Sequence, residues 1–278
     1  MKTSARFVPD TGDRADVNGV APQPMLDVRD LAFGFGPRRV GSGITFSLAR
    51  GETLAVLGGN GAGKTTLFRT LLGLLPPQGG SLRIGGVALP ELTLRERARR
   101  LAYVPQQHVP AFGFSVLEAV LMGRASLVGT FARPGDDDYR AAHGALATLR
   151  IDALARRPVT EISGGERQLV MIARALAQQA AVLVLDEPTA SLDFGNRARV
   201  LGEIDRLREG GMTILFSTHE PDHAIAHADR ALLLADGGML ALDRVERALT
   251  TANIERLYRT PVRLVRIDAR RYACVPAA

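Results

Sequence analysis

The sequence predicts an α/β fold in which helices flank a mostly parallel sheet, with an N-terminal antiparallel β part and an inserted α-helical subdomain. Continuous apolar runs, such as residues 182–185 and 212–217, are typical of strands buried on both faces, as in parallel sheets. Near the N-terminus, strand-like segments are joined by short glycine turns, which favours antiparallel pairing. A helical periodicity from residue 115 to about residue 154 separates these strand-rich parts.

Composition limits the class of protein. The chain has 278 residues, 46% of them hydrophobic, which is enough for one large core or two modest ones. Its one cysteine, Cys274, excludes an internal disulfide and suits a reducing compartment. The net charge of +6 is scattered along the chain and decides nothing about nucleic acid or lipid. We expect no secretory signal and no membrane span, since no apolar run reaches about eighteen residues.

The N-terminal part is predicted to begin with a flexible tail, residues 1–24, which is polar, rich in Pro and Gly and without periodicity. Strands are expected at Met25–Leu31 and Ile44–Leu48, with a turn at residues 34–37. Phe33 and Phe35 are both candidates for the core. Phe35 lies between two glycines in the turn, and this position favours stacking on a nucleobase over burial.

The most informative stretch is residues 58–66, GGNGAGKTT. It follows an apolar run and opens a periodic one, which is the strand–turn–helix context that gives the pattern GxxxxGK[ST] its mechanism. Backbone N–H groups of the glycine loop and the helix N-terminus would bind phosphate, Lys64 would reach the terminal phosphates, and the Thr65 hydroxyl would bind Mg²⁺. The candidate nucleotide-binding residues here are Gly58, Asn60, Gly61, Gly63, Lys64, Thr65 and Thr66.

Lysine usage supports this interpretation. Of 35 basic residues, only Lys2 and Lys64 are lysine and the others are arginine. A compact ammonium is therefore kept where a phosphate would be met as a point charge. The chain is predicted to bind a nucleoside triphosphate.

The middle of the chain alternates between strands and helices. The periodicity after the glycine loop extends to Leu75, where Pro76–Pro77 stops the helix, and a hairpin with its turn at Gly85–Gly86 follows. A basic helix over residues 93–100 leads to a strand, residues 101–104, that ends at Pro105 before Gln106. Helical residues resume at Ser115, with a loop around residues 129–138.

A second glycine pair, Gly164-Gly165, opens a helix predicted to run to about Gln178. Ser163 and Glu166 form a capping box, which by itself accounts for the start of a helix. A capping box does not require two glycines in the first turn, where each is less favourable than alanine by about 1 kcal/mol. We interpret Gly164 and Gly165, with Ser163 beside them, as a second anion-binding segment.

Carboxylates follow the apolar strand at residues 182–185. Because ligands bind at the C-terminal edge of open α/β sheets, Asp186 would hold Mg²⁺, directly or through water, and Glu187 could polarise an attacking water. An acidic strand end without function is the alternative. Ser191-Leu192-Asp193 is predicted to cap the next helix, which runs to about Glu209.

His219 follows the strand at residues 212–217 and would contact a γ-phosphate. The spacing of His219, His223 and His227 also resembles a metal site. We reject that interpretation, because Pro221 favours a helix start between His219 and the other two. The remaining chain is predicted as a hairpin around residues 236–238, two short helices (245–249 and 251–258) and a strand at residues 262–267.

The ordered set of motifs resembles the ATPase subunit of an ATP-binding cassette (ABC) transporter, from Met25 to about Val265. The motifs appear as the phosphate loop, Gln106, the signature at residues 163–166, Asp186-Glu187, Ser191-Leu192-Asp193 and His219. Each is moderately specific, and the ordered set is very specific. The signature departs from the commonest form at Ile162 and Glu166, which replace Leu and Gln. Its serine and glycines are intact, so ATP binding is expected to survive.

The resemblance implies a head-to-tail dimer of identical chains that binds ATP and Mg²⁺ at their interface. Each ATP would contact the phosphate loop of one copy and residues 163–165 of the other. Glu187 would act as general base, His219 would contact the γ-phosphate, and Asp193 would support communication across the dimer. Thr65, Gln106 and Asp186 would hold or sense Mg²⁺. Catalysis would consist mostly of positioning and charge stabilisation.

The same resemblance implies an ABC ATPase domain at residues 25–265, a helical subdomain at about 107–178 and a C-terminal extension at 266–278. Residues 114–124 and 217–224 resemble the ATPases of type II importers for iron–siderophore, haem, cobalamin or, in one branch, molybdate and tungstate. The implied partners are transmembrane permease subunits and, indirectly, an extracytoplasmic substrate-binding protein, at the cytoplasmic face of the inner membrane. Iron chelates are favoured, as the most populated branch.

Three other classes are disfavoured. A nucleic-acid-linked ABC ATPase would need a coiled-coil insertion, zinc modules or a second cassette, and the chain has one cysteine and one phosphate loop. An exporter ATPase is disfavoured by residues 114–124. A non-catalytic ATP-gated module is disfavoured because Glu187 and His219 are both present.

Overall fold

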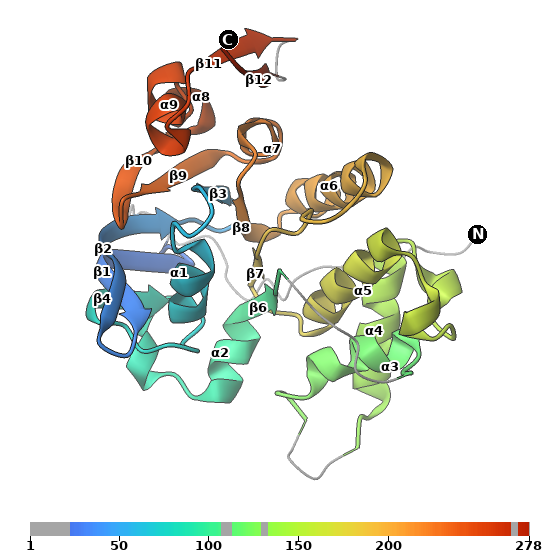
Figure 1. The fold of residues 1–278 in the computed structure, drawn as a ribbon. Coiled ribbons are helices and arrows are strands. Elements are labelled where there is room, and N and C mark those ends of the chain that lie inside the picture. Colours follow the sequence, from blue (N-terminus) through green and yellow to red (C-terminus); the bar gives the residue numbers. More distant parts are fainter. Residues whose placement is uncertain (1–22, 107–112, 129–132, 268–271, 278) are drawn as a thin grey trace, which may run out of the picture.

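The computed structural model describes residues 23–106, 113–128, 133–267 and 272–277 (Figure 1). Nearly all of the predicted N-terminal tail, residues 1–22, lies outside this part of the chain. So do residues 107–112, at the start of the predicted helical subdomain, and residues 129–132 of its predicted loop.

A six-stranded sheet forms the centre of the molecule, in the order β10-β9-β3-β8-β7-β6. All neighbouring strands in it are parallel except β10, which pairs antiparallel with β9. The strands are β3 (Thr53–Leu57), β6 (Leu101–Val104), β7 (Val182–Leu185), β8 (Thr213–Thr218), β9 (Arg230–Ala235) and β10 (Gly238–Arg244). The mostly parallel sheet with helices is as predicted.

A four-stranded antiparallel sheet carries the N-terminal part, in the order β2-β1-β4-β5. Its strands are β1 (Leu26–Phe35), β2 (Arg38–Leu48), β4 (Gly79–Ile84) and β5 (Val87–Ala88). The first two strands are longer than predicted and leave only Gly36 and Pro37 between them. Phe33 is fully buried and Phe35 is 45% exposed, which agrees with the expectation that a position between two glycines disfavours burial of Phe35.

Side chains of the central strands alternate between two hydrophobic cores. In β3, Leu54 and Val56 face the core shared with the antiparallel sheet and α1 (Lys64–Leu71). Ala55 and Leu57 face the core shared with α5 (Gly164–Ala177) and α6 (Phe194–Glu209). This two-sided burial explains why the parallel strands are continuous apolar runs rather than alternating ones.

The helices of the predicted helical subdomain lie together to one side of the sheet, away from β1, β2 and β4 (Figure 1). Its helices are α3 (Val116–Leu121), α4 (Asp136–Thr148) and α5 (Gly164–Ala177), with short 3-10 turns at Met122–Arg124, Asp152–Leu154 and Val159–Glu161. Gln178, at the end of α5, donates hydrogen bonds to the carbonyls of Ala98 and Leu101 and so ties this subdomain to the start of β6. The remaining helices before the C-terminal part are α2 (Leu94–Arg100), α6 (Phe194–Glu209) and α7 (Pro221–His227), with a further 3-10 turn at Leu89–Glu91.

The C-terminal part contains α8 (Val245–Ala248), α9 (Thr251–Tyr258) and a two-stranded sheet of β11 (Val262–Arg266) and β12 (Tyr272–Pro276). We did not predict β12. It packs on α7, and the amide of Cys274 donates to the Asp222 side chain at 2.8 Å.

Two helix boundaries were predicted wrongly. Helix α1 ends at Leu71 and not near Pro76, because Gly73 adopts a left-handed conformation with φ of 69°. Leu74, which the periodicity assigned to the helix, is 62% exposed. Helix α4 begins at Asp136, inside the predicted loop, because the Asp138 side chain accepts the Gly135 amide. In the described part of the chain, no helix is both long and apolar enough to cross a membrane.

Candidate active site

The glycine loop lies between β3 and α1, as the motif predicts. Gly63 caps the helix with φ of 93°, and a Cβ atom there would lie 2.7 Å from Val40 Cγ1. Only glycine combines this backbone conformation with so close an approach. The loop therefore places its own N–H groups and the first turn of α1 around one wall of a cavity.

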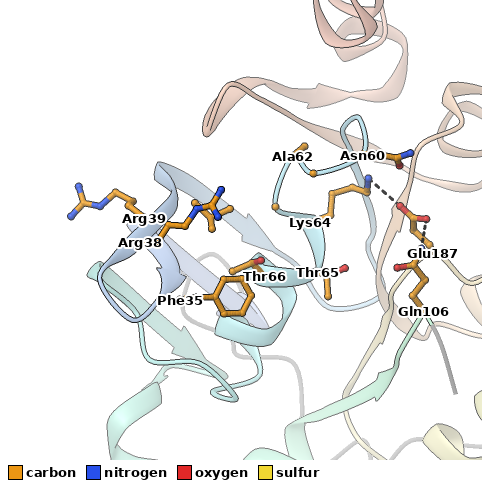
Figure 2. A pocket seen from close by; sticks show the side chains of 13 residues that line it. Phe35, Arg38, Arg39, Asn60, Ala62, Lys64, Thr65, Thr66, Gln106 and Glu187 are labelled. Atoms are coloured by element: carbon orange, nitrogen blue, oxygen red, sulfur yellow. Dashed lines mark hydrogen bonds and ion pairs between the residues drawn. The ribbon is translucent and has the colours of Figure 1, made fainter. Parts of the chain in front are cut away.

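That cavity has a volume of about 450 Å³ (Figure 2). It is lined by nine of the predicted site residues, which are Phe35, Asn60, Gly61, Gly63, Lys64, Thr65, Thr66, Gln106 and Glu187. These residues come from the β1–β2 hairpin, the glycine loop, the segment after β6 and the segment after β7. The structure thus brings together residues that lie up to 152 positions apart in the sequence (187 − 35).

Lys64 is the buried cation of this cavity. Its side chain is 6% exposed, and Nζ donates to the carbonyl oxygens of Gly58 at 2.8 Å and Gly59 at 3.3 Å. Nζ also lies 3.0 Å from Oε1 of Glu187. The ammonium is therefore held by the backbone carbonyls of the glycine loop and by the Glu187 carboxylate opposite (Figure 2).

Glu187 meets three side chains from three parts of the chain. While Oε1 faces Lys64, Oε2 accepts a hydrogen bond from Gln106 Nε2 at 2.8 Å and lies 3.4 Å from His219 Nδ1. Its backbone is left-handed, with φ of 46°, and its amide donates to Ser217 Oγ at 2.8 Å. Such a conformation is costly outside glycine and is found where the surrounding structure fixes a functional side chain. Sequence patterns gave no sign of it.

Asp186 lies behind the cavity wall. It is fully buried, and its two oxygens accept hydrogen bonds from Ser217 Oγ at 2.6 Å and Tyr103 Oη at 3.2 Å. Burial, and next the charge of Asp186, raise the pKa of Tyr103, so this hydroxyl remains a donor. Sequence reasoning missed both partners. Their signal is positional, since β6 and β8 flank β7 in the parallel sheet.

The donor set fits Mg²⁺. The Thr65 hydroxyl, the Gln106 amide oxygen and the Asp186 carboxylate are hard oxygen ligands of the type that Mg²⁺ prefers. Thr65 and Gln106 line the cavity, whereas Asp186 is set back from it. This arrangement suits contact through water for Asp186 better than direct coordination.

Arg38 and Arg39 also line the cavity, beside Phe35, and were not predicted. Figure 2 shows the Arg38 side chain between Phe35 and the glycine loop, with Arg39 pointing away from it. Their position directly after the predicted turn was the available signal, because a hairpin returns its second strand alongside the first.

The second glycine pair does not line this cavity. The predicted capping box is present at the start of α5: Ser163 Oγ accepts the Glu166 amide at 3.2 Å, and Glu166 accepts the Ser163 amide at 2.9 Å. The hydrogen bond from the Ser163 amide is the largest cause that lowers the pKa of Glu166, and the Ser163 side chain is the next. Ser163 and Gly164 are exposed, and Gly165 is buried.

Asp193 also lies outside the cavity wall, exposed at the start of α6. Its side chain accepts the Asn196 amide at 2.9 Å, as predicted for a cap, and this hydrogen bond lowers its pKa. The segments around Ser163 and Asp193 adjoin each other, because a Cβ atom on Gly165 would lie 2.0 Å from Asn196 Oδ1. Together they form a second, exposed set of predicted site residues.

The three histidines face three different carboxylates. His219 faces Glu187, His223 Nε2 lies 3.2 Å from Glu220, and His227 Nδ1 lies 2.8 Å from Asp205. As expected, His219 precedes α7 and is not on one helical face with the other two.

Comparisons with known proteins agree on one family. A family model described as ABC transporter matches residues 42–190. A hemin import ATP-binding protein (HmuV) of Nocardia farcinica is 42% identical over 84% of this chain and 80% of its own length. A molybdate import ATP-binding protein (MolC) of Haemophilus influenzae is 38% identical over 79% of this chain and 81% of its own length.

A solved structure has the same fold. It is an inward-facing conformation of a transporter assigned to the metal-chelate ABC type. The two chains are 34% identical with a TM-score of 0.81, and the likeness covers 92% of this chain and 98% of that one.

Proposed function

The chain belongs to the ATP-binding subunits of ABC transporters, which are ATPases, and we propose that it powers a membrane importer for a metal chelate or related cofactor. Glu187 carries this proposal: Lys64, Gln106 and His219 surround one carboxylate on the wall of the phosphate-loop cavity. This arrangement supports a site that both binds a triphosphate and activates water beside it.

ATP would lie with its base on Phe35 and its phosphates along residues 58–66. The exposed ring of Phe35 supports stacking, which contributes roughly 1–3 kcal/mol and tolerates any base. The terminal phosphates would replace Glu187 as the partner of the Lys64 ammonium. Phosphate oxygens carry more charge than a carboxylate and also accept hydrogen bonds from the loop amides.

Glu187 would then act as general base. Its neighbouring side chains determine which of its oxygens can face the attacking water. When Lys64 turns to phosphate, Gln106 and His219 still hold Oε2. The carboxylate therefore keeps its place while its other oxygen becomes available to accept a proton from water. His219, 45% exposed, would contact the γ-phosphate from the same side.

Mg²⁺ would be held by Thr65 and Gln106, with Asp186 acting through water. The ion would neutralise charge on the transferred phosphoryl group. Asp186 is kept in place by Ser217 and Tyr103, so it can orient water without moving.

A second copy of the chain would complete the site. ABC cassettes function as dimers with transmembrane permeases. The exposure of Ser163, Gly164 and Asp193, away from the cavity of their own chain, supports a head-to-tail pair in which each signature faces the partner's ATP. The permease would bind the cassette at the cytoplasmic face of the inner membrane, and an extracytoplasmic binding protein would deliver the cargo.

The cargo proposed is an iron–siderophore or another metal chelate, and the metal-chelate transporter is the structural neighbour that supports it. Haem, cobalamin, and molybdate or tungstate are alternatives within the same class, and relatives named for hemin and molybdate import keep them open. An exporter is the weaker alternative.

Uptake tests the importer and the cargo together. Cells whose only copy is wild type or Glu187→Gln would be given labelled ferric siderophores, haem, cobalamin and molybdate. We expect the variant to lose uptake of one cargo, because binding remains and hydrolysis stops. Glu246→Gln, the same change on an exposed residue of α8, is the matched control and should transport normally. Undiminished uptake of all four cargoes by Glu187→Gln would refute the importer assignment.

A further inference from the structure

His219 occupies a position that secondary structure does not fix. It lies in the short connection between the end of β8 at Thr218 and the start of α7 at Pro221. Pro221 has no amide hydrogen to donate back to this connection. The carbonyl oxygen of His219 instead accepts a hydrogen bond from Tyr258 Oη, at 2.8 Å.

Tyr258 is well suited to hold that carbonyl. It is the last residue of α9, half-buried, and packs against the main core. Burial is the largest cause that raises its pKa, followed by the charges of Cys274, Glu187 and Glu220. The hydroxyl is therefore a donor throughout the physiological pH range.

The C-terminal two-stranded sheet of β11 and β12 contacts the two elements that flank this hydrogen bond. On α7, Asp222 lies three residues after His219 and accepts the Cys274 amide of β12 at 2.8 Å. On the α9 side, the Val262 amide at the start of β11 donates to Glu255 at 3.1 Å. Leu264 and Cys274 pack against the main core. This sheet thus contacts α7 through β12 and α9 through β11, the two helices next to His219 and Tyr258 in the sequence (Figure 1).

The residue after His219 is held from the opposite direction. Glu220 Oε2 lies 2.9 Å from Arg197 Nη1 of α6 and 3.2 Å from His223 Nε2. Burial lowers the pKa of His223 to about 4, so His223 is neutral near pH 7 and Arg197 is the charged partner. The connection is therefore anchored by side chains on both sides of its short span.

We propose that Tyr258 is a positioning residue for His219. Its hydroxyl fixes the backbone of the connection. The backbone in turn fixes the position of the His219 imidazole relative to Glu187 and a γ-phosphate. The proposal rests on the function proposed above, because it gives Tyr258 a task only if His219 acts in hydrolysis. The proposal also gives the C-terminal sheet of β11 and β12 a role, which is to hold α9 and α7 in fixed positions relative to the active site.

The variant Tyr258→Phe tests this, because it removes the hydroxyl and leaves the ring. Loss of one hydrogen bond to the connection should lower kcat about three- to ten-fold, while KM and the equilibrium affinity for ATP stay within about two-fold. The matched control is Tyr139→Phe, on an exposed tyrosine of α4, which should leave both constants unchanged. A Tyr258→Phe enzyme with wild-type kcat would overturn the proposal.

His219→Ala separates this proposal from the proposed function. If Tyr258 acts through His219, adding Tyr258→Phe to His219→Ala should lower kcat no further. An equal loss in both backgrounds would overturn the inference and leave the function intact. A His219→Ala enzyme with wild-type kcat would instead overturn the role proposed for His219 itself.

A readout without turnover covers the case in which His219→Ala is inactive. The imidazole signal of His219 in the full chain, identified by its loss in His219→Ala, can be followed by NMR. Tyr258→Phe should shift or broaden that signal and leave that of His143, on α4, in place. An unchanged His219 signal in Tyr258→Phe would contradict the proposal.

Discussion

Lys64 and Glu187 lie 3.0 Å apart, with side chains that are 6% and 10% exposed. A buried charge without a partner is strongly destabilising, so each side chain supplies the opposite charge that the other needs. The same contact means that a triphosphate must replace one partner of Lys64 as it enters. Gln106 and His219 limit the cost of that exchange, because they continue to hold Glu187.

This exchange predicts opposite effects of two single substitutions on ATP affinity. Lys64→Ala should weaken equilibrium binding about ten- to hundred-fold, since a charge-assisted contact to phosphate is lost. Glu187→Gln should bind at least as tightly as wild type, because the carboxylate that competes for Lys64 and repels phosphate is gone. Titration with a fluorescent ATP analogue measures both, with thermal unfolding as the check on the fold. Unchanged affinity in Lys64→Ala would refute the phosphate-loop assignment.

The residues that line the cavity were mostly predictable, and the residues behind them were not. Lys64, Thr65 and Glu187 follow from a loop and a strand end whose chemistry is local in sequence. Tyr103 and Ser217 hold Asp186 only because β6 and β8 pair with β7, and Tyr258 reaches His219 across 39 positions. A single sequence does not specify such contacts, since they depend on how the elements are packed.

At the scale of elements, the start of α5 shows how two adjacent glycines have different tasks. Gly165 is buried against α6, where a Cβ atom would lie 2.0 Å from Asn196 Oδ1 and 2.7 Å from Asn196 Cβ. Gly164 is exposed, and among the residues that the structure describes a Cβ atom there would meet only Leu192 Cδ2, at 3.9 Å. Packing thus explains one of the two glycines that sequence analysis interpreted together as an anion site.

The pair makes a controlled test. Gly165→Ala should destabilise the fold by about 1–3 kcal/mol, because α5 or α6 must shift, and the melting temperature should fall by several degrees. Gly164→Ala should melt at or slightly above the wild-type temperature, as alanine favours the helix by up to about 1 kcal/mol. ATP hydrolysis should nevertheless fall in Gly164→Ala, since its methyl group would meet the nucleotide of a partner.

Full hydrolysis by a stable Gly164→Ala enzyme would show that this helix start does not contact ATP.

The boundaries of helices and strands were predictable only in part. Periodicity alone extended α1 to Leu75, and only the left-handed Gly73 shows where the helix ends. Strand β12 was missed because residues 272–276 show no apolar alternation, and their strand conformation depends on antiparallel pairing with β11.

At the scale of the molecule, the predicted site residues lie in two separate groups. One is the cavity around Lys64 and Glu187, and the other is the exposed surface around Ser163 and Asp193. The fold class and the order of elements were predictable from apolar runs and turns. The strand order β10-β9-β3-β8-β7-β6 was not, because it depends on which connections cross the sheet. Two copies related head to tail would join each group to its complement.

Sedimentation velocity of Glu187→Gln, with and without ATP and Mg²⁺, is the most direct test of the shared site. We expect a monomer without nucleotide and a dimer with it, because ATP would bridge two chains and would not be hydrolysed. The double variant Lys64→Ala/Glu187→Gln should stay monomeric at the same nucleotide concentration. A Glu187→Gln protein that binds ATP and remains a monomer, at concentrations well above the affinity for ATP, would contradict the shared site.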